Sequence, residues 1–267
     1  MLIITKKEIK IPKNIPNLII IVGPCRVGTT ALANIFSKVG LTVYMQPIKS
    51  ARRAKEAGEK IVQWKILEGN IVVAKETLGP KTEAEFFDPI KILLKAGYPK
   101  EKLILIPIIR DSRKTLASWR SMWISLNLEK FVQTYKLVLE IKNKAESMGI
   151  KTIPYVHEVT RDQSSYAVIR KLFKKIGLKK SISKNVIDWT KGRKFGKDSN
   201  LKFYDAPSDR FVKEVKSWET YKYQEEPYLQ LSSSDEVFIK KNKVLEDIYE
   251  EFRKGCQKAL GLKIRPF

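Results

Sequence analysis

Cysteine and histidine are scarce in this sequence. Two cysteines, Cys25 and Cys256, and one histidine occur among 267 residues, without CxxC or Cys/His spacing. This scarcity excludes a disulfide framework, argues against a structural zinc site and favours a reducing compartment. Long apolar runs are also missing, because a run such as LIIIV is too short to span a bilayer, and the N-terminus lacks the pattern of a signal peptide. We therefore expect a soluble, cytoplasmic protein without a transmembrane segment.

Acidic residues are few relative to basic ones. The chain has 52 Lys and Arg against 29 Asp and Glu, which gives a formal net charge of +23. Such a surplus attracts phosphorylated or polyanionic ligands. The charge also fits lysines that solvate helix surfaces, since they are scattered through segments such as KLFKKIGLKK. Ordered aromatic and basic spacing is not evident, so no specific nucleic-acid partner is predicted, although a non-catalytic protein that binds nucleic acid or acidic glycans remains an alternative.

Strand-like and helix-like segments alternate along the chain. NLIIIVG and LILIPII are short apolar runs typical of buried parallel strands, and LTVYMQ and TIPYVHE indicate further strands. Residues 29–39 carry apolar side chains at helical spacing before Gly40. This order predicts one α/β domain over residues 1–267, a three-layer sandwich with a central, mainly parallel sheet. Ligands of such sheets bind at the carboxyl ends of the strands.

Three regions give weaker patterns. KIVQWKI and NIVVAKE predict two strands separated by a turn at Gly69-Asn70. Thr82-x-x-Glu85 has the form of a capping box, and Asp88-Pro89 offers a second helix start before IKILLKAG. Residues 178–240 show poor periodicity and receive no firm assignment, whereas the apolar stripe over residues 244–260 predicts a C-terminal helix.

A glycine-containing loop follows the first apolar strand. Gly23-x4-Gly28 followed by Thr29-Thr30 has the spacing of a phosphate-binding loop, or P-loop, but Thr29 stands where a nucleoside triphosphatase places its lysine. Arg26 supplies a cation within the loop, and the amides that open the next helix favour an anion. The pattern predicts an anion site, and a generic strand-to-helix turn is the alternative.

The loop resembles the first signature of the sulfotransferases that use 3′-phosphoadenylyl sulfate (PAPS), which has the form P-[KR]-S-G-T-T. Aligned on Gly-Thr-Thr, Arg26 falls on the basic residue of the family, Val27 replaces Ser and Cys25 replaces Pro. The resemblance implies a P-loop fold, PAPS as the donor and adenosine-3′,5′-bisphosphate (PAP) as the product. The implied nucleotide-binding residues of this segment are Cys25, Arg26, Val27, Gly28, Thr29 and Thr30.

A second signature of the family is an arginine at a strand end and a serine eight residues later, which hold the 3′-phosphate. In LILIPIIRDSRKTLAS, Arg110 ends the strand and Ser118 follows eight residues on, about two turns of about 3.6 residues into the next helix. A guanidinium forms forked contacts to a phosphate, and a hydroxyl adds a donor. Alternatively, Arg110 pairs with a neighbouring carboxylate and Ser118 is a solvated helix residue.

The resemblance extends over about residues 18–178. TIPYVHEVTRDQSSYAVIRKLFKKIGL is similar to the family segment with a Tyr-Glu-Asp turn, so His157 is expected near the adenine, unless it is a half-buried strand residue held by hydrogen bonds. Many members also bring an Arg-Lys-Gly turn to the 3′-phosphate. Arg193 and Lys194 are our candidates, and Phe252-Arg253-Lys254-Gly255 is closer to the literal pattern but lies on the expected final helix.

The implied reaction is an in-line sulfuryl transfer, which needs a cation, a base and exclusion of water, and no metal. Arg26 would stabilise charge on the leaving phosphate. NIVVAKET places Lys75 and Glu76 at a strand end, where an ammonium and a carboxylate could face the sulfuryl group. We expect Glu76 to be the base, with Glu158 in reserve, and a surface ion pair is the alternative for Glu76.

Two further points stay open. A P-loop kinase or triphosphatase in which Asp111 holds Mg²⁺ is a competing interpretation, and the absent loop lysine counts against it. The acceptor pocket is expected in segments 41–70 and 178–240, whose sequences do not identify it. The basic surface favours an acidic small molecule, saccharide or lipid as the acceptor. The oligomeric state is not predicted.

Overall fold

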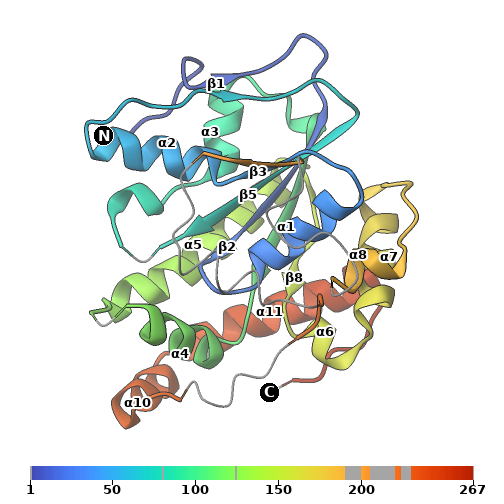
Figure 1. Cartoon of the computed structure of the whole chain (residues 1–267). Helices are drawn as coiled ribbons and strands as arrows, with labels where there is room; N and C mark the ends of the chain where they lie inside the picture. Colours follow the sequence, from blue (N-terminus) through green and yellow to red (C-terminus); the bar gives the residue numbers. More distant parts are fainter. Residues whose placement is uncertain are drawn as a thin grey trace.

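A parallel β-sheet lies at the centre of the protein, seen in a computed structural model that describes residues 2–79, 81–123, 125–189, 200–204, 220–223 and 230–266 (Figure 1). The strand order is β7-β6-β2-β5-β3-β9, and β8 also pairs with β6. All of these pairings are parallel. The strands are β2 (Asn17–Pro24), β3 (Val43–Met45), β5 (Ile71–Leu78), β6 (Leu103–Ile109), β7 (Lys151–Thr152), β8 (Tyr155–Val156) and β9 (Leu201–Phe203).

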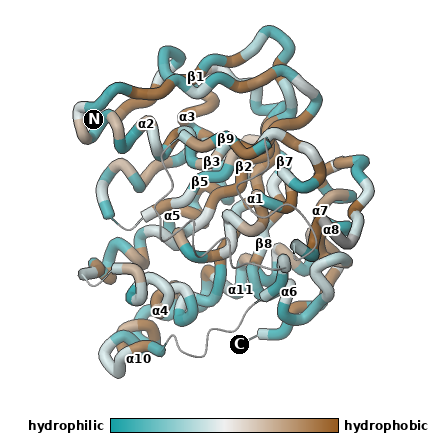
Figure 2. Tube along the Cα trace, viewed as in Figure 1, coloured by the Kyte–Doolittle hydropathy of each residue, from teal (hydrophilic) through white to brown (hydrophobic). Residues whose placement is uncertain are grey.

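Strand β2 lies in the middle of the sheet, and both of its faces are covered. The side chains from Leu18 to Val22 are 0% exposed, which explains why the strand is continuously apolar instead of alternating. It pairs with β5 on one side and with β6 on the other. One core of buried apolar side chains extends from Ile4 to Ile264 and includes this strand. Figure 2 shows the apolar chain gathered in the middle of the molecule.

Helices cover both faces of the sheet, so the expected α/β layering is confirmed. The crossovers from β2 to β3 and from β5 to β6 run in opposite directions along the sheet, and right-handed connections therefore place their helices on opposite faces. Phe36 and Phe173 stack at 5.4 Å between ring centroids and join α1 to α7 on one face. The helices are α1 (Thr29–Lys38), α2 (Pro47–Glu56), α3 (Pro89–Ala96), α4 (Ser112–Met122), α5 (Leu128–Ser147), α6 (Val159–Asp162), α7 (Ser165–Ile176), α8 (Lys184–Ile187), α10 (Ser233–Lys241) and α11 (Lys243–Leu260).

The connections create a switch point between β2 and β6. The segment after β2 leads to α1 on one face, whereas the segment after β6 leads through α4 to α5, which belongs to the opposite face by the same crossover rule. In open parallel sheets, a crevice at the carboxyl ends of two such strands is the usual place for a ligand. This topology puts the glycine loop and the segment that begins at Arg110 at the same edge.

The two strands expected around Gly69 do not form a common unit. Of KIVQWKI, only β4 (Trp64–Lys65) is a strand, and it pairs with β1 (Ile9–Lys10) in a separate two-stranded sheet. The following β5 instead enters the main sheet, because its apolar run needs cover on both faces. The chain bends at Gly69-Asn70 between the two strands, but β4 and β5 lie in different sheets.

The capping box expected at Thr82 is absent. Residues Glu83–Glu85 form a short 3-10 turn, η1, whose first residue is not capped by the Thr82 side chain. Helix α3 starts at the second expected position, where the amide of Lys91 donates to the Asp88 carboxylate at 2.9 Å. The pattern fails because the Glu85 carboxylate is used elsewhere, in an ion pair with Lys49.

The C-terminal third contains an element that the sequence did not predict. Helix α10 lies within the segment without clear periodicity, and Ser232 caps it by accepting from the amide of Asp235 at 3.2 Å. The predicted final helix is present as α11 and packs on β8, α5 and α7. Within the described ranges, no helix combines the length and the apolar character needed to cross a bilayer.

Candidate functional site

The glycine loop, residues 23–28, has a tightly constrained backbone. Arg26 has a φ of 70° and Gly28 a φ of 87°, both in the left-handed region. A non-glycine residue adopts this conformation at a cost of about 1 kcal/mol or more, and such strain is concentrated at functional sites. A Cβ on Gly28 would lie 2.6 Å from Nδ1 of His157, so the loop approaches the end of β8 closely. Only glycine fits this position.

The arginine of the loop contacts the serine eight residues after Arg110. Nε of Arg26 donates to Oγ of Ser118 at 2.9 Å. The neighbouring Trp119 is fully buried, and its indole Nε1 donates to the carbonyl oxygen of Cys25 at 2.7 Å. Two consecutive residues of α4 therefore hold the loop from the β6 side. The structure brings together Arg26 and Ser118, which lie 92 residues apart in the sequence.

Arg110 lies at the carboxyl end of β6 and is 6% exposed. Its carbonyl oxygen accepts a hydrogen bond from the buried Tyr135 hydroxyl at 2.8 Å, which fixes the backbone there. Its guanidinium carbon lies 5.8 Å from the centroid of the Tyr223 ring. Tyr223 belongs to the segment that the sequence left unassigned, and no local pattern identified it.

His157 joins Arg110 to the glycine loop. Its ring lies against Tyr223 in a tilted arrangement, with centroids 5.6 Å apart and an angle of 40° between the planes, and its amide donates to the carbonyl of Ile109 at 2.9 Å. Burial, and to a smaller extent the charge of Arg110, lowers the pKa of His157 to about 3, so the imidazole is neutral at pH 7. Its Nδ1 makes no hydrogen bond to any described residue, which differs from the alternative of a hydrogen-bonded strand histidine.

The other predicted loop residues contribute in different ways. Val27 is 0% exposed and its side chain packs inward, so only its main chain can meet a ligand. Thr29 and Thr30 are 2% and 8% exposed in the first turn of α1. The first amides of a helix have no partners within the helix, and here they open at the carboxyl edge of the sheet.

Glu76 does not form the surface ion pair that was the alternative to its role as a base. It is 0% exposed, and its two carboxylate oxygens accept from the amides of Ile48 at 2.8 Å and of Lys49 at 3.2 Å. It therefore caps the start of α2. Burial outweighs these hydrogen bonds and raises the pKa of Glu76 to about 7. Its role as a base stays a prediction, and the geometry shows that its oxygens already have partners.

Lys49 is a buried cation that the sequence did not reveal. It is 1% exposed, and Nζ lies 3.4 Å from Oγ1 of Thr77 and 3.4 Å from a carboxylate oxygen of Glu85. Arg53 pairs with the same carboxylate. In the sequence Lys49 belongs to the basic stretch KSARRAKEAGE, which is typical of a solvated helix, so no local pattern marked it.

Lys75 is 4% exposed and lies inside β5, which continues to Leu78, so its expected position at the strand end is wrong. Burial lowers its pKa to about 8, against an opposing effect of Cys25, so most of its population is protonated at pH 7. It makes no hydrogen bond or ion pair with the described part of the chain. The ammonium is thus a charge near the loop that is available to an anion.

Glu158, the reserve base, contacts the backbone next to Arg110. It is 0% exposed and accepts from the amide of Asp111 at 3.1 Å. Burial, with a contribution from Asp111, raises its pKa to about 7. Asp111 itself caps α4 by accepting from the amide of Arg113 at 2.7 Å. Both carboxylates support the backbone around Arg110.

Of the late-chain candidates, only the segment with Arg253 lies within the described residues. Arg193 and Lys194 lie outside the described residues. Arg253 pairs with Glu250 at 2.7 Å and donates to the carbonyl of Ile264 at 2.8 Å, so it secures the C-terminal tail to α11. No group of three or more His, Cys, Asp or Glu able to hold a metal occurs among the described residues, and the expectation of a metal-free reaction stays a prediction.

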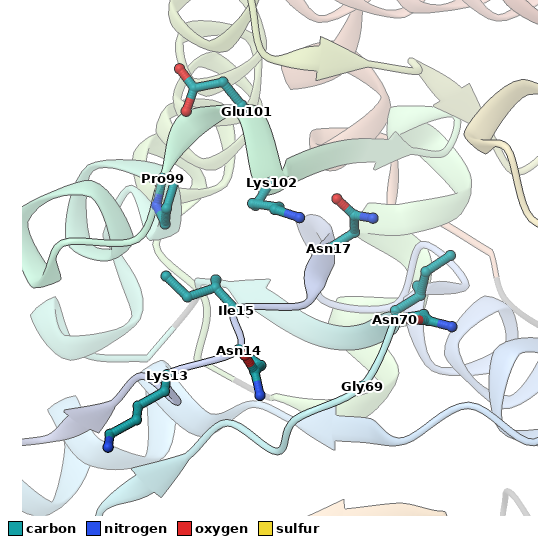
Figure 3. Close-up of a pocket in the computed structure, with 10 residues that line it drawn as sticks. Lys13, Asn14, Ile15, Asn17, Gly69, Asn70, Pro99, Glu101 and Lys102 are labelled. Atoms are coloured by element: carbon teal, nitrogen blue, oxygen red, sulfur yellow. The ribbon is translucent and has the colours of Figure 1, made fainter.

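A hollow of about 720 Å³ lies at the opposite edge, at the amino ends of β2, β5 and β6 (Figure 3). Its polar lining includes Lys13, Asn14, Asn17, Asn70 and Lys102, most of them exposed. Buried charged groups do not converge there. The carboxyl edge is therefore the better candidate site.

Comparison of the chain with protein-family models, with curated proteins and with solved structures gave no match. The assignment of a function therefore depends on the geometry of the site and on the resemblance of its short motifs.

Proposed function

We propose that this protein is a sulfotransferase that moves a sulfuryl group from PAPS to a hydroxyl or amine of an acceptor. The observation that carries the proposal is the 2.9 Å hydrogen bond between Arg26 and Ser118. It joins the two motif segments into one site at the switch point between β2 and β6. The P-loop assignment of the glycine loop belongs to the same proposal.

The β6 side of the loop would hold the adenosine and its 3′-phosphate. Arg110 is nearly buried and supplies a guanidinium at the strand end, and Ser118 adds a hydroxyl donor. The neutral ring of His157 and the ring of Tyr223 offer aromatic surface beside them, which suits a base. This environment accounts for a preference for a 3′-phosphorylated nucleotide over a triphosphate.

The glycine loop and the β5 side would hold the reacting end of the donor. The first amides of α1, with the Thr29 and Thr30 hydroxyls, surround the 5′-phosphate, and Arg26 stabilises charge on it as the phosphate leaves. The Lys75 ammonium faces the sulfuryl oxygens. Because its pKa is about 8, it is a cation for most of its population at pH 7.

In the transfer step, the acceptor oxygen or nitrogen attacks sulfur and the bond from sulfur to the bridging phosphate oxygen breaks. PAP leaves with the charge that Arg26 and the amides stabilise. Glu76 is our first choice to take the acceptor proton, since a base with a pKa of about 7 is matched to neutral pH. It would have to release the Lys49 amide, its longer contact at 3.2 Å. An acidic small molecule, saccharide or lipid acceptor is favoured by the charge of +23.

Calorimetric titration tests the proposal. PAP and ATP with Mg²⁺ are titrated into the parent protein and into Arg26→Ala, Arg110→Ala and Arg170→Ala. Arg170 is exposed on α7 and is the matched control. We expect the parent to bind PAP in preference to ATP, both site variants to lose at least tenfold in affinity, about the effect of a lost charged hydrogen bond, and the control to be unchanged.

Two results would contradict the proposal. Preferential binding of ATP with Mg²⁺ would support a kinase or triphosphatase. Salt-dependent retention on nucleic acid or acidic glycans, with no PAP binding, would support a non-catalytic basic protein.

A further inference from the structure

Cys25 is turned away from Ser118, toward the β5 side of the glycine loop. Its thiol donates to the carbonyl oxygen of Gly79 at 3.1 Å. Nζ of Lys49 lies 3.7 Å from the same sulfur. The cysteine is partly exposed, so the sulfur combines access from solvent with a neighbouring ammonium. Neither contact belongs to the nucleotide site on the β6 side.

A second, independent observation at this position is Lys75. The side chain is 96% buried, since 4% of its surface is exposed, and it has no hydrogen-bond or ion-pair partner among the described residues. After burial, the groups that affect the pKa of Lys75 are, in decreasing order, Cys25, Lys49, Glu76 and Arg53, so these residues surround it. A buried ammonium without a partner is unfavourable, and an anionic group placed at the Cys25 sulfur would relieve this.

From this geometry, we propose that Cys25 is a site of oxidative modification by peroxides, with Lys49 and Lys75 stabilising the anionic forms of its sulfur. In the step, the thiol first loses its proton to solvent, and the sulfur attacks one oxygen of hydrogen peroxide. An S–O bond forms and the O–O bond breaks. The departing hydroxide takes a proton from solvent and leaves as water. Sulfur is oxidised by two electrons and the peroxide is reduced by two, which yields a sulfenic acid.

The lysines favour both the attack and its product. The nucleophile is the thiolate, and ammonium groups beside it stabilise negative charge on sulfur. The oxygen added to sulfur gives Lys75 the acceptor that it lacks. The modified residue would then occupy the position expected for the reacting end of an anionic ligand, so oxidation and anion binding at the loop would exclude each other.

Cys256 provides a control within the same molecule. It is 0% exposed in the packed face of α11, and burial raises its pKa to about 12. Oxidation of cysteine follows thiolate character and exposure. The two cysteines therefore differ in access and in charged surroundings, and only Cys25 is expected to react in the folded protein.

The test treats the full-length protein with hydrogen peroxide in the presence of a sulfenic-acid trap and follows each cysteine by peptide mass spectrometry. We expect Cys25 to be trapped at least about tenfold faster than Cys256. Lys75→Met should slow trapping at Cys25 about tenfold, whereas Lys75→Arg should retain the parent rate. Lys65→Met, on an exposed lysine of β4, is the matched control and should have no effect.

Equal trapping of Cys25 in the parent and in Lys75→Met, or no trapping in the parent, would overturn the proposal. Rapid trapping of Cys256 would show that Lys75→Met has lost its fold. In that case Lys75→Arg is compared with the parent. A lower trapping rate at Cys25 in Lys75→Arg, which keeps the positive charge, would also contradict the proposal. Inorganic sulfate should slow trapping at Cys25 in the parent. Unchanged trapping would contradict the claim that the oxidised sulfur and an anionic ligand occupy the same position.

A final arm rests on the proposed function. Oxidised parent protein should lose PAP binding, and reduction of the sulfenic acid with dithiothreitol should restore it. If Cys25 is trapped as expected but the untreated protein never binds PAP, the modification site stands and the proposed function fails. If PAP binds equally before and after oxidation, the claim of mutual exclusion fails while the proposed function stands.

Discussion

The two sides of the glycine loop hold their charges in different ways. On the β6 side, Arg26 contacts a hydroxyl and Arg110 faces an aromatic ring. On the β5 side, Lys49 and Glu85 form an ion pair in which both side chains are at most 2% exposed. A buried ion pair is part of the packed structure, because loss of either partner leaves an uncompensated buried charge. The Lys49–Glu85 pair therefore maintains the shape of the loop on the β5 side, whereas in the proposed function the β6 side would select the nucleotide.

The largest expected effect comes from breaking the β5 side. Glu85→Gln leaves the Lys49 ammonium without its buried carboxylate, and we expect a loss of about 3–5 kcal/mol in the free energy of unfolding. Urea denaturation measures it. The matched control is Glu250→Gln, which removes a more exposed pair with Arg253 and should cost under about 1 kcal/mol. Equal losses in the two variants would remove the distinction between the sides.

The β6 side should show a marked dependence of stability on pH. The pKa of Glu158 is raised from 4.5 to about 7, so its contribution to stability is full below pH 4.5 and is lost as the pH rises through 7. The shift corresponds to a loss on the order of 3 kcal/mol. The pKa of Glu76 is raised to the same value, so thermal unfolding of the parent between pH 5 and pH 8 should show the sum of two declines, and Glu158→Gln should remove about half of it. A variant that declines as steeply as the parent would assign the dependence to another group.

The contact between the loop and His157 can be isolated with two glycines. Gly28→Ala and Gly40→Ala both place a side chain at a positive φ, but only at Gly28 would the new Cβ meet another residue. We expect a loss of about 1 kcal/mol for Gly40→Ala and about 2–3 kcal/mol for Gly28→Ala, because the latter also displaces His157. Similar losses of unfolding free energy in the two variants would show that the His157 side chain can move aside at little cost and does not fix the loop.

The smallest effect is expected from the link between the two segments on the β6 side. Ser118→Ala removes one hydroxyl that contacts Arg26, and we expect a three- to tenfold weaker affinity for PAP, about 1 kcal/mol, with little change in stability. Calorimetry with Ser121→Ala as the control on the same helix measures the difference. An effect as large as that of Arg110→Ala would mean that Ser118 organises the whole site.

Sequence patterns predicted the β6 side better than the β5 side. The sequence identified Arg26, Arg110 and Ser118 as candidates because each lies at a fixed, short spacing from the end of an apolar strand. The carboxyl ends of parallel strands meet at one edge of the sheet. The sequence did not identify Lys49 and Glu85 as a pair, because they lie in distant segments and neither stands in a recognisable motif for an ion pair. Glu85 even suggested a helix cap. Tyr223 lies in a stretch without periodicity, where no pattern fixes the position of a side chain.

In the proposed function, Arg26 and Arg110 bind opposite ends of one adenine nucleotide, and a ligand that lacks one phosphate distinguishes their roles. PAP and adenosine-5′-monophosphate are titrated into the parent, Arg26→Ala and Arg110→Ala. The account predicts that Arg26→Ala weakens both ligands, whereas Arg110→Ala weakens PAP at least tenfold, about the effect of a lost charged hydrogen bond, and leaves the monophosphate unchanged. Equal losses of both ligands in Arg110→Ala, or no loss of PAP, would contradict it.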